Sequence, residues 1–289
     1  MSDYVIVTDS TCDLPQEMAD EMNIKVVRLH VLLDGKSYEN YLDGRELSFP
    51  DMYNAMRNKK LPTTSQATYQ GFLECFEPIL NEGKDILYVG FSGAMSGTYQ
   101  AGCLCANDML EKYPDRKILT VDSLAASSGE GLLVYLCAKK KEEGLSLEEV
   151  QMYGKENALH MCHTFTVADL MHIMRGGRAS KGSAIIGTII GIKPILRINE
   201  EGLIEAYDKI RGRKRAISKV IETFKENVTD LDTPVFVSHG DCEEEALDMA
   251  RRLKEEVGIK NVIINYVGAV CGCHGGPDIL AIFYHGKKR

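Results

Sequence analysis

Three side chains near the end of the sequence have the chemistry of a metal site. Cys271, Cys273 and His274 stand together in the glycine-rich stretch VGAVCGCHGGPDI. Zinc prefers thiolate and imidazole ligands, and the stretch HMCH at residues 160–163 could supply a fourth. However, the chain has no C-x-x-C pair, and a C-x-C-H turn seldom directs three ligands at one ion. The alternative is that both cysteines are small buried residues in a turn, and that His274 binds something other than a metal.

The same histidine could serve a serine hydrolase. Ser96, His274 and an acid such as Asp9 are the residue types of a catalytic triad. Ser96 lies in GFSGAMSGTYQ at residues 90–100, where neither Ser92 nor Ser96 fits the G-x-S-x-G signature of a nucleophile elbow. Because this signature is missing, a hydrolase acting on a lipid-like ester is only the alternative hypothesis.

Hydroxyl side chains collect in segments that could bind an anion. Ser96 precedes a predicted helix, where it could cap the helix, help backbone N–H groups to capture an anion, or do both. Thr63 and Thr64 follow Pro62 in PTTSQ, a stretch that is also typical of a turn before a helix. None of these segments offers a dense set of acids or bases, so they favour binding over catalysis.

Two arginines and an apolar segment occur in the second half of the chain. Arg175 and Arg178 are separated by two glycines, and a guanidinium can pair with a carboxylate or a phosphate. The alternative is a structural ion pair at a helix end. Gly177 and Gly182 have the spacing of a phosphate loop, but the lysine that such a loop needs is missing. The apolar residues 181–196 include small ones, and either form a core helix or leave room for an apolar ligand.

The first half of the chain must position several of these residues through alternating strands and helices. Apolar runs at 4–9, 24–33, 85–92 and 117–123 predict strands, and helices are predicted at 14–23, 48–59, 68–83, 96–110, 127–144 and 145–160. This alternation predicts βαβ units around a mostly parallel sheet with flanking helices. TDSTCDLP, with Asp9 and Asp13, and GFSGAMSGTYQ both follow predicted strands. Ligands bind beyond the carboxyl ends of such strands, although Asp13 could equally be a helix cap.

The second half has a different pattern. Strands are predicted at 160–167, 233–240, 261–267 and 279–286, and a hairpin at 194–210. Helices are predicted at 170–194, where glycines interrupt the pattern, and at 214–227 and 242–258. These elements indicate an α+β domain with a mixed or antiparallel sheet. We therefore expect an α/β protein of two domains, residues 1–159 and 160–289.

Composition excludes several classes of protein. The formal net charge of −8 over 289 residues disfavours broad binding to nucleic acid or to an anionic membrane surface. No window has the ~18 uninterrupted apolar residues of a spanning helix, and MSDYVIVTDS lacks the pattern of a signal peptide. We expect a cytoplasmic protein with nine reduced cysteines and no stable membrane insertion.

The ordered set TDSTCDLP, PTTSQ, SGAMSGTYQ, VDS, RGGRASK, KPIL and HGGPD resembles the bacterial DegV proteins along nearly the whole chain. The resemblance implies a two-domain α/β fold that buries one long-chain fatty acid, which we expect between the domains. It also implies an acyl-carrying subunit of a fatty acid kinase. Such a subunit presents the carboxylate to a separate ATP-dependent kinase, which makes an acyl phosphate for phospholipid synthesis. On this interpretation the chain is not an enzyme and needs no cofactor or metal.

The resemblance also assigns a carboxylate clamp. A threonine of TTSQ, a serine of SGT and the histidine of the C-terminal glycine loop would hold the carboxylate, and these are Thr64, Ser96 and His274. The glycines would let the loop approach the ligand head, and the neighbouring cysteines would be bystanders. The residues expected to support the clamp are Thr63, Ser92, Arg175 and Arg178.

Two positions depart from the family pattern, and one basic cluster could serve the partner. The family usually reads T-S-Q-P, but Ala67 follows Gln66; its loop commonly reads H-x-G-P-G, but Asp278 follows Pro277. An additional acid near the head group could repel a carboxylate.

The basic residues within 211–215 could dock the kinase, or could form a solvated helix start.

Overall fold

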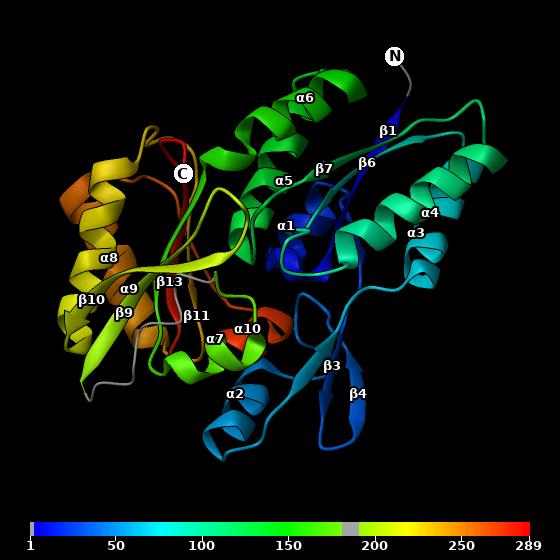
Figure 1. Ribbon diagram of the computed structural model, residues 1–289. Coiled ribbons are helices and arrows are strands. Elements are labelled where there is room, and N and C mark those ends of the chain that lie inside the picture. The colour runs from blue at the N-terminus through cyan, green and yellow to red at the C-terminus, as the bar shows by residue number, and fades with distance from the viewer. Residues whose placement is uncertain (1–2, 181–190) are drawn as a thin grey trace.

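The computed structural model describes residues 3–180 and 191–289. Its first half contains a fully parallel sheet, which confirms the expected strand and helix alternation (Figure 1). The strand order is β2 (Lys25–Val27), β1 (Tyr4–Asp9), β6 (Asp85–Gly90) and β7 (Ile118–Asp122). The helices of this half are α1 (Gln16–Glu21), α2 (Phe49–Arg57), α3 (Tyr69–Asn81), α4 (Thr98–Lys112), α5 (Ser128–Glu142) and α6 (Leu147–Asn157).

Both faces of this sheet are buried because helices cover both. Side chains alternate along a strand, so Tyr4 and Leu87 pack in the core formed with α5 and α6, whereas Val5 and Tyr88 pack in the core formed with α3 and α4. Figure 1 shows these two helix pairs on opposite sides of the sheet. The hydroxyl-rich segments follow directly after the carboxyl ends of β1 and β6.

A small antiparallel sheet, which the sequence reading did not separate, extends from the first half. It consists of β4 (Lys36–Glu39), β3 (His30–Leu33) and β5 (Thr63–Ser65). The stretch PTTSQ thus forms a strand rather than only a turn, because Thr64 pairs with Val31 in the β3–β5 ladder. This pairing gives Thr64 a fixed direction.

The second half contains the mixed sheet that the sequence predicted. Its order is β10 (Ile204–Arg211), β9 (Ile192–Ile198), β8 (Met161–Thr166), β13 (Leu280–His285), β11 (Val235–His239) and β12 (Val262–Tyr266). Only β11 and β12 run parallel among these neighbours, and β9 with β10 forms the predicted hairpin. The helices α8 (Arg213–Asn227) and α9 (Glu243–Arg252) cover one face, and the other faces the first half.

Two predictions of local structure were wrong. The predicted helix 170–194 is not continuous, because α7 (Leu170–Gly176) ends at Gly177 with a φ of +66°. Residues 192–194 already belong to β9, and most of the apolar stretch, 181–190, lies outside the described residues. The C-terminal glycine loop is in fact the helix α10 (Ala269–Gly275), so Cys271, Cys273 and His274 are helical rather than in a turn.

One hydrophobic core contains residues from both halves. It joins Leu132 of α5 to Phe165 of β8 and to Ala281 and Phe283 of β13. The division into domains at residue 160 stays a prediction. In the part of the chain that the structure describes, no helix combines the length and the apolar character needed to cross a bilayer.

Candidate ligand-binding site

A cavity of about 350 Å³ lies where the two halves of the chain meet. It is bounded by the loops that follow β1 and β6, by β5, α7 and α10, and by the inner face of the second sheet. Apolar side chains supply much of its wall, including Phe91, Ile173, Phe165, Ile198, Ile204 and Phe283. A cavity of this kind suits a ligand with a long apolar portion.

Thr64, Ser96 and His274 all line this cavity, although they come from three separate segments. The Thr64 Oγ1 and His274 Nε2 atoms are 3.0 Å apart, so strand β5 and helix α10 meet through this hydrogen bond. Ser96 lies in the loop between β6 and α4, and its Oγ is 2.9 Å from Thr98 Oγ1. The backbone N–H of Thr98 also donates to Ser96 Oγ at 3.2 Å. Ser96 therefore orders the start of α4 while it faces the cavity.

Unlike the three clamp residues, most of the residues expected to support the clamp lie outside the cavity wall. Thr63 is exposed and absent from the cavity wall, although its neighbour Thr64 lines the cavity. Ser92 is fully buried, and its hydroxyl donates to the carbonyl of Gly202 at 2.8 Å. Ser92 thus ties the β6–α4 loop to the turn of the β9–β10 hairpin, and it does not line the cavity.

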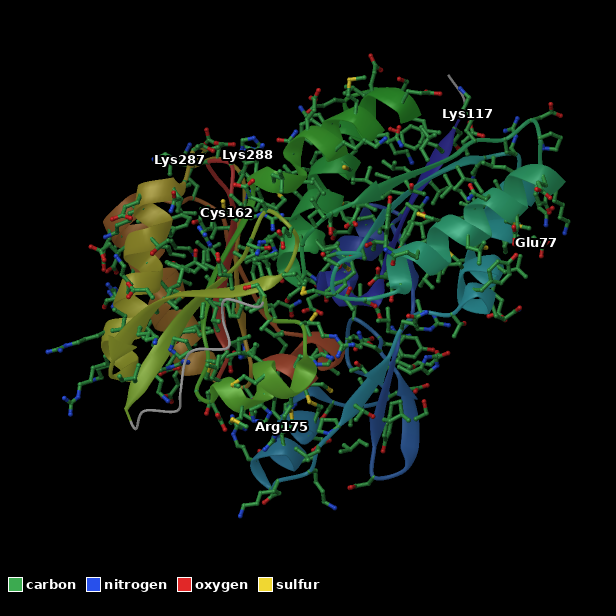
Figure 2. All side chains as sticks on the ribbon, viewed as in Figure 1. Glu77, Lys117, Cys162, Arg175, Lys287 and Lys288 are labelled. Atoms are coloured by element: carbon green, nitrogen blue, oxygen red, sulfur yellow. The ribbon has the colours of Figure 1, made fainter. Side chains whose placement is uncertain are left out.

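The two arginines also differ in position. Arg175 is exposed on α7 and is not part of the cavity wall (Figure 2). Arg178 does line the cavity, and its guanidinium donates to the carbonyl oxygens of Met95, at 3.2 Å, and Gly176. Arg178 is exposed to solvent, and within the described residues it forms no salt bridge, so its contacts there are to backbone carbonyl oxygens and not to an acid at the helix end.

The environment of His274 keeps its imidazole neutral near pH 7. Burial, with a smaller contribution from the positive charge of Arg178, lowers the pKa of His274 to about 4. Gly176 packs so close that a Cβ there would lie 2.8 Å from His274 Nδ1. A neutral imidazole has one N–H, and a carboxylate placed beside it would raise this pKa again.

The side chains of the possible zinc site do not converge. Cys271 and His274 lie one helical turn apart on α10 and both line the cavity, whereas Cys273 packs in the core with Tyr53. The pKa of the Cys271 thiol is well above its usual range because of burial and nearby carboxyl groups, so it is a poor ligand. Among residues 3–180 and 191–289, no group of three or more His, Cys, Asp and Glu is arranged to hold a metal.

The arrangement also gives no support to the hydrolase alternative. Ser96 Oγ is paired with Thr98, and His274 Nε2 with Thr64, so the contact between nucleophile and base that defines a triad is missing. Asp9 is fully buried and bonded to Thr11 rather than to His274. The site has the polar groups of a binding pocket without a connected catalytic chain.

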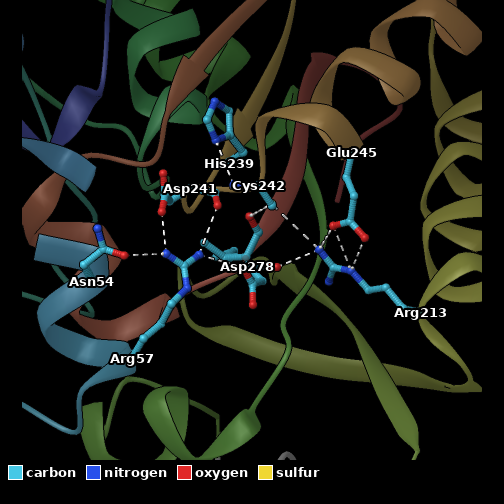
Figure 3. A network of polar contacts seen from close by, with 9 residues as sticks. Asn54, Arg57, Arg213, His239, Asp241, Cys242, Glu245 and Asp278 are labelled. Carbon is cyan, nitrogen blue, oxygen red and sulfur yellow. Dashed lines mark hydrogen bonds and ion pairs between the residues drawn. The ribbon is translucent and has the colours of Figure 1, made fainter. Parts of the chain in front are cut away.

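Asp278 does not enter the cavity. Its carboxylate accepts from Arg57 Nη2 at 2.9 Å and its carbonyl from Arg213 Nη2 at 2.7 Å, in a network that includes Asp241 and Glu245 (Figure 3). Because Asp278 pairs with Arg57, the expected repulsion between Asp278 and a ligand carboxylate is reduced.

Ala67 is also accommodated. It is buried, and its backbone N–H donates to Thr98 Oγ1 at 3.2 Å. A proline at this position could not make that bond. The departure from T-S-Q-P thus adds one tie between the end of β5 and the start of α4.

Sequence reasoning missed several residues of the wall. Thr11, Ser127, His163 and Cys271 all line the cavity. The motif TDSTCDLP indicates the neighbourhood of Thr11, whereas Cys271, expected to be a bystander, shares a helix face with His274 and lines the cavity. The sequence indicates His163 only as one possible fourth zinc ligand, and this residue reaches the cavity because β8 lies inside the second sheet.

The sequence and the fold of this chain are similar to those of known proteins. The sequence model of the DegV family of uncharacterised proteins matches residues 3–287. A DegV domain-containing protein of Clostridium perfringens is 38% identical over 290 residues, covering 100% of this chain and 99% of that one. The solved structure of a fatty acid-binding DegV family protein from Thermus thermophilus has a TM-score of 0.88 at 28% identity, covering 99% of this chain and 100% of that one. DegV from Bacillus subtilis, a fatty acid-binding protein, gives a TM-score of 0.85 at 28% identity, covering 98% and 99%.

Proposed function

The chain belongs to the DegV family, and on this basis we propose that it binds one long-chain fatty acid in the cavity. Thr64, Ser96 and His274 hold the carboxylate, and the apolar wall takes the alkyl chain. One observation carries the proposal: these three polar residues, from three segments, meet at a cavity with a largely apolar wall. The fatty acid-binding relatives of the same fold support it.

The energetics favour such a ligand. Burying about fifteen carbons at ~0.8 kcal/mol each contributes roughly 12 kcal/mol before association and ordering costs. An unpaired carboxylate would lose several kcal/mol on burial. Two hydroxyls and the imidazole of His274 offset that loss by donating hydrogen bonds, and the nearby charge of Arg178 favours the anion.

We further propose that the chain acts in the cytoplasm as the acyl-carrying partner of a separate kinase. The absence of a phosphate-loop sequence and the unconnected Ser96 and His274 support a carrier rather than an enzyme. With ATP and a fatty acid alone, no acyl phosphate should form, and product should appear only when a fatty acid kinase subunit is added. Turnover by the isolated chain would exclude the carrier role.

A displacement titration tests the binding proposal. Delipidated protein carrying a fluorescent fatty acid is titrated with hexadecanoic acid and with hexadecanol. The acid should compete strongly and the alcohol at least about tenfold more weakly, because the alcohol lacks the charge that the clamp binds. Equal competition would refute the clamp, and no competition by either would refute the lipid site.

A further inference from the structure

Two buried carboxyl groups lie behind the cavity wall, outside the proposed clamp. Asp9 ends β1 and Glu130 lies in the first turn of α5, and neither side chain is accessible to solvent. Thr11, a residue of the wall, stands between them: its Oγ1 contacts Asp9 Oδ1 and lies 2.9 Å from Glu130 Oε2. The hydroxyl of Thr8 lies 2.9 Å from the other oxygen of Glu130.

The number of available protons decides the charge of this cluster. A hydroxyl carries one proton, so Thr11 can donate to one carboxyl group and must accept from the other. Asp9 accepts hydrogen bonds from the backbone N–H groups of Thr11 and Phe91, both at 3.1 Å. A backbone N–H can only donate, so these two bonds require acceptor oxygens on Asp9. The contacts of Glu130 are hydroxyl groups, which can rotate. The proton that Thr11 accepts therefore belongs to Glu130.

We propose that Glu130 is protonated in the native fold and donates to Thr11, which in turn donates to an ionised Asp9, and that Glu130 is thereby a positioning residue of the ligand site. Each oxygen of the cluster then meets a donor or carries a proton. The second part of this proposal rests on the proposed function; the first does not. Burial and the charge of Asp9 hold the pKa of Glu130 well above its usual range. Burial also raises the pKa of Asp9, but hydrogen bonds from Thr11, Phe91 and Tyr88 oppose that rise, in agreement with the hydrogen-bond geometry.

The turn that contains Thr11 is bonded to the sheet that carries Thr64. This turn is the short 3₁₀ helix Ser10–Cys12. The hydroxyl of Ser10 accepts the backbone N–H of Leu29 at 3.0 Å, one residue before β3 begins. Since β3 pairs directly with β5, the position of the turn is transmitted to Thr64.

The end of the same turn holds helix α10. The side-chain amide of Asn265 donates to the carbonyl of Asp13 at 2.9 Å. The Asp13 side chain packs directly against Gly268, where a Cβ would lie 2.2 Å from Asp13 Oδ1, and Gly268 is the N-cap of α10, the helix that carries His274. The turn that Glu130 fixes thus lies between the two elements whose separation sets the Thr64–His274 contact.

The surroundings of Glu130 oppose its ionisation. Titratable groups of β1 and its turn, of β6 and of α10 act on it, namely Asp9, Cys12, Asp13, Tyr88 and Cys271. All of these become negative when they ionise. His163 packs against the neighbouring Gly129 and is neutral because burial lowers its pKa. Within the described part of the chain Glu130 makes no ion pair that could balance a second negative charge.

This charge state makes stability depend on pH in a defined direction. The raised pKa means that the native state holds one more proton than the unfolded state at pH values between the ordinary and the raised pKa of Glu130. The folding equilibrium constant therefore falls as pH rises through that window, by up to about tenfold per pH unit for one proton. Glutamine matches the protonated acid in shape and hydrogen bonding but cannot ionise.

The experiment compares Glu130→Gln and Glu130→Ala with Glu142→Gln, an exposed glutamate on the same helix. Urea unfolding of the ligand-free protein is followed between pH 5 and pH 8. Relative to wild type, Glu130→Gln should gain stability as pH rises, by up to about tenfold in the folding equilibrium constant per pH unit. Glu142→Gln should follow wild type. Burial raises the pKa of Asp13 to about 7, so infrared spectra of the ligand-free protein are recorded at pH 8, where a carboxylic acid carbonyl band should remain that Glu130→Gln removes.

The positioning role is tested on hexadecanoic acid affinity. Glu130→Ala should weaken binding by about tenfold or more, and Glu130→Gln should restore it to within about threefold. If Glu130→Gln loses stability at every pH while Asp9→Asn is tolerated, the proton is on Asp9 and the assignment is wrong. If Glu130→Ala folds and binds as wild type, the positioning role is wrong. If wild type binds no fatty acid, the proposed function fails, but the unfolding and infrared results still decide the charge state.

Discussion

His274 is the residue on which the proposed recognition of a carboxylate depends most. His274→Ala removes an N–H donor but leaves the apolar wall, so affinity for hexadecanoic acid should fall about ten- to hundredfold, or ~1.5–3 kcal/mol. Thr64→Ala and Ser96→Ala should have a similar or smaller effect. The losses should not add, because the three donors share one carboxylate. Displacement titrations measure each variant.

The matched control is Thr63→Ala, since Thr63 is exposed beside Thr64 and lies outside the cavity wall. It should bind as wild type, and affinity for hexadecanol should barely respond to His274→Ala. An effect at Thr63 as large as that at Thr64, or an unaltered affinity in His274→Ala, would be inconsistent with the clamp.

The imidazole of His274 should also make the fold sensitive to acid. Its pKa falls from an ordinary value of 6.5 to about 4 in the fold, so the unfolded chain binds more protons between these values. Stability is therefore present above pH 6.5 and is lost as pH falls toward 4. Between pH 6.5 and pH 5 this one group should remove up to about 2 kcal/mol of unfolding free energy.

Urea unfolding of wild type and His274→Gln at pH 7 and pH 5 measures this contribution. The variant should lose less stability over the interval, although other buried histidines such as His163 act in both proteins. Bound fatty acid should reduce the acid sensitivity of wild type, because a carboxylate raises the pKa of His274. Identical pH dependence in the two proteins would show that His274 is not buried as described.

Some residues of the site could be predicted from the sequence, whereas their distant partners could not. The resemblance to the DegV family is what singles out Thr64, Ser96 and His274, and all three line one cavity in the fold. The partner of Asp278 could not be found in this way, since Arg57 lies 221 positions earlier in the chain. A pairing between segments so far apart is set by the packing of the whole fold and leaves no local pattern.

Among the elements, α10 departs most from the sequence prediction. Glycine disfavours a helix by about 1 kcal/mol relative to alanine, and residues 268–276 contain four glycines. The helix forms nevertheless because it packs against α2 and α7, and because Gly272 allows close approach: a Cβ there would lie 2.4 Å from the hydroxyl of Tyr53. Local propensity predicted a loop, and tertiary packing overrides it.

Gly272→Ala separates these two influences. Helix propensity alone would stabilise the variant by about 1 kcal/mol, whereas the clash with Tyr53, which is fully buried, should destabilise it by about 1–3 kcal/mol. We expect a net loss in unfolding free energy, measured by urea denaturation, together with weaker fatty acid binding because α10 carries His274. A more stable variant would show that packing at Gly272 is not what shapes this helix.

The start of α8 is the element that could dock a kinase. Arg211, at the end of β10, and Lys214 and Arg215, in the first turn of α8, are exposed, but Arg213 is already paired with Glu245 at 2.6 Å. Replacing Lys214 and Arg215 by glutamate should weaken kinase-dependent acyl phosphate formation and reduce its salt sensitivity, without altering fatty acid affinity. Lys225→Glu, at the other end of α8, is the control. Unaltered kinetics in the double variant would mean that these charges only face solvent.

At the scale of the whole molecule, the parallel and the mixed sheet followed directly from the spacing of apolar runs, turns and glycines. The cavity did not, because its wall combines β5, α7 and α10 with loops after β1 and β6 and with the second sheet. Periodicity indicates which side of an element is buried but not which other element covers it. The shared core, which joins Leu132 to Phe283 across 151 positions, is a property of the assembled halves.

The central claim is that this chain carries one long-chain fatty acid in its cavity, and native mass spectrometry of the purified protein tests it most directly. The spectrum should show the chain together with one additional lipid-sized mass, which organic extraction identifies as a fatty acid of about 14 to 18 carbons. After delipidation the chain should take up one equivalent of such an acid. A chain that purifies without lipid and, once delipidated, binds none of these acids would contradict the claim.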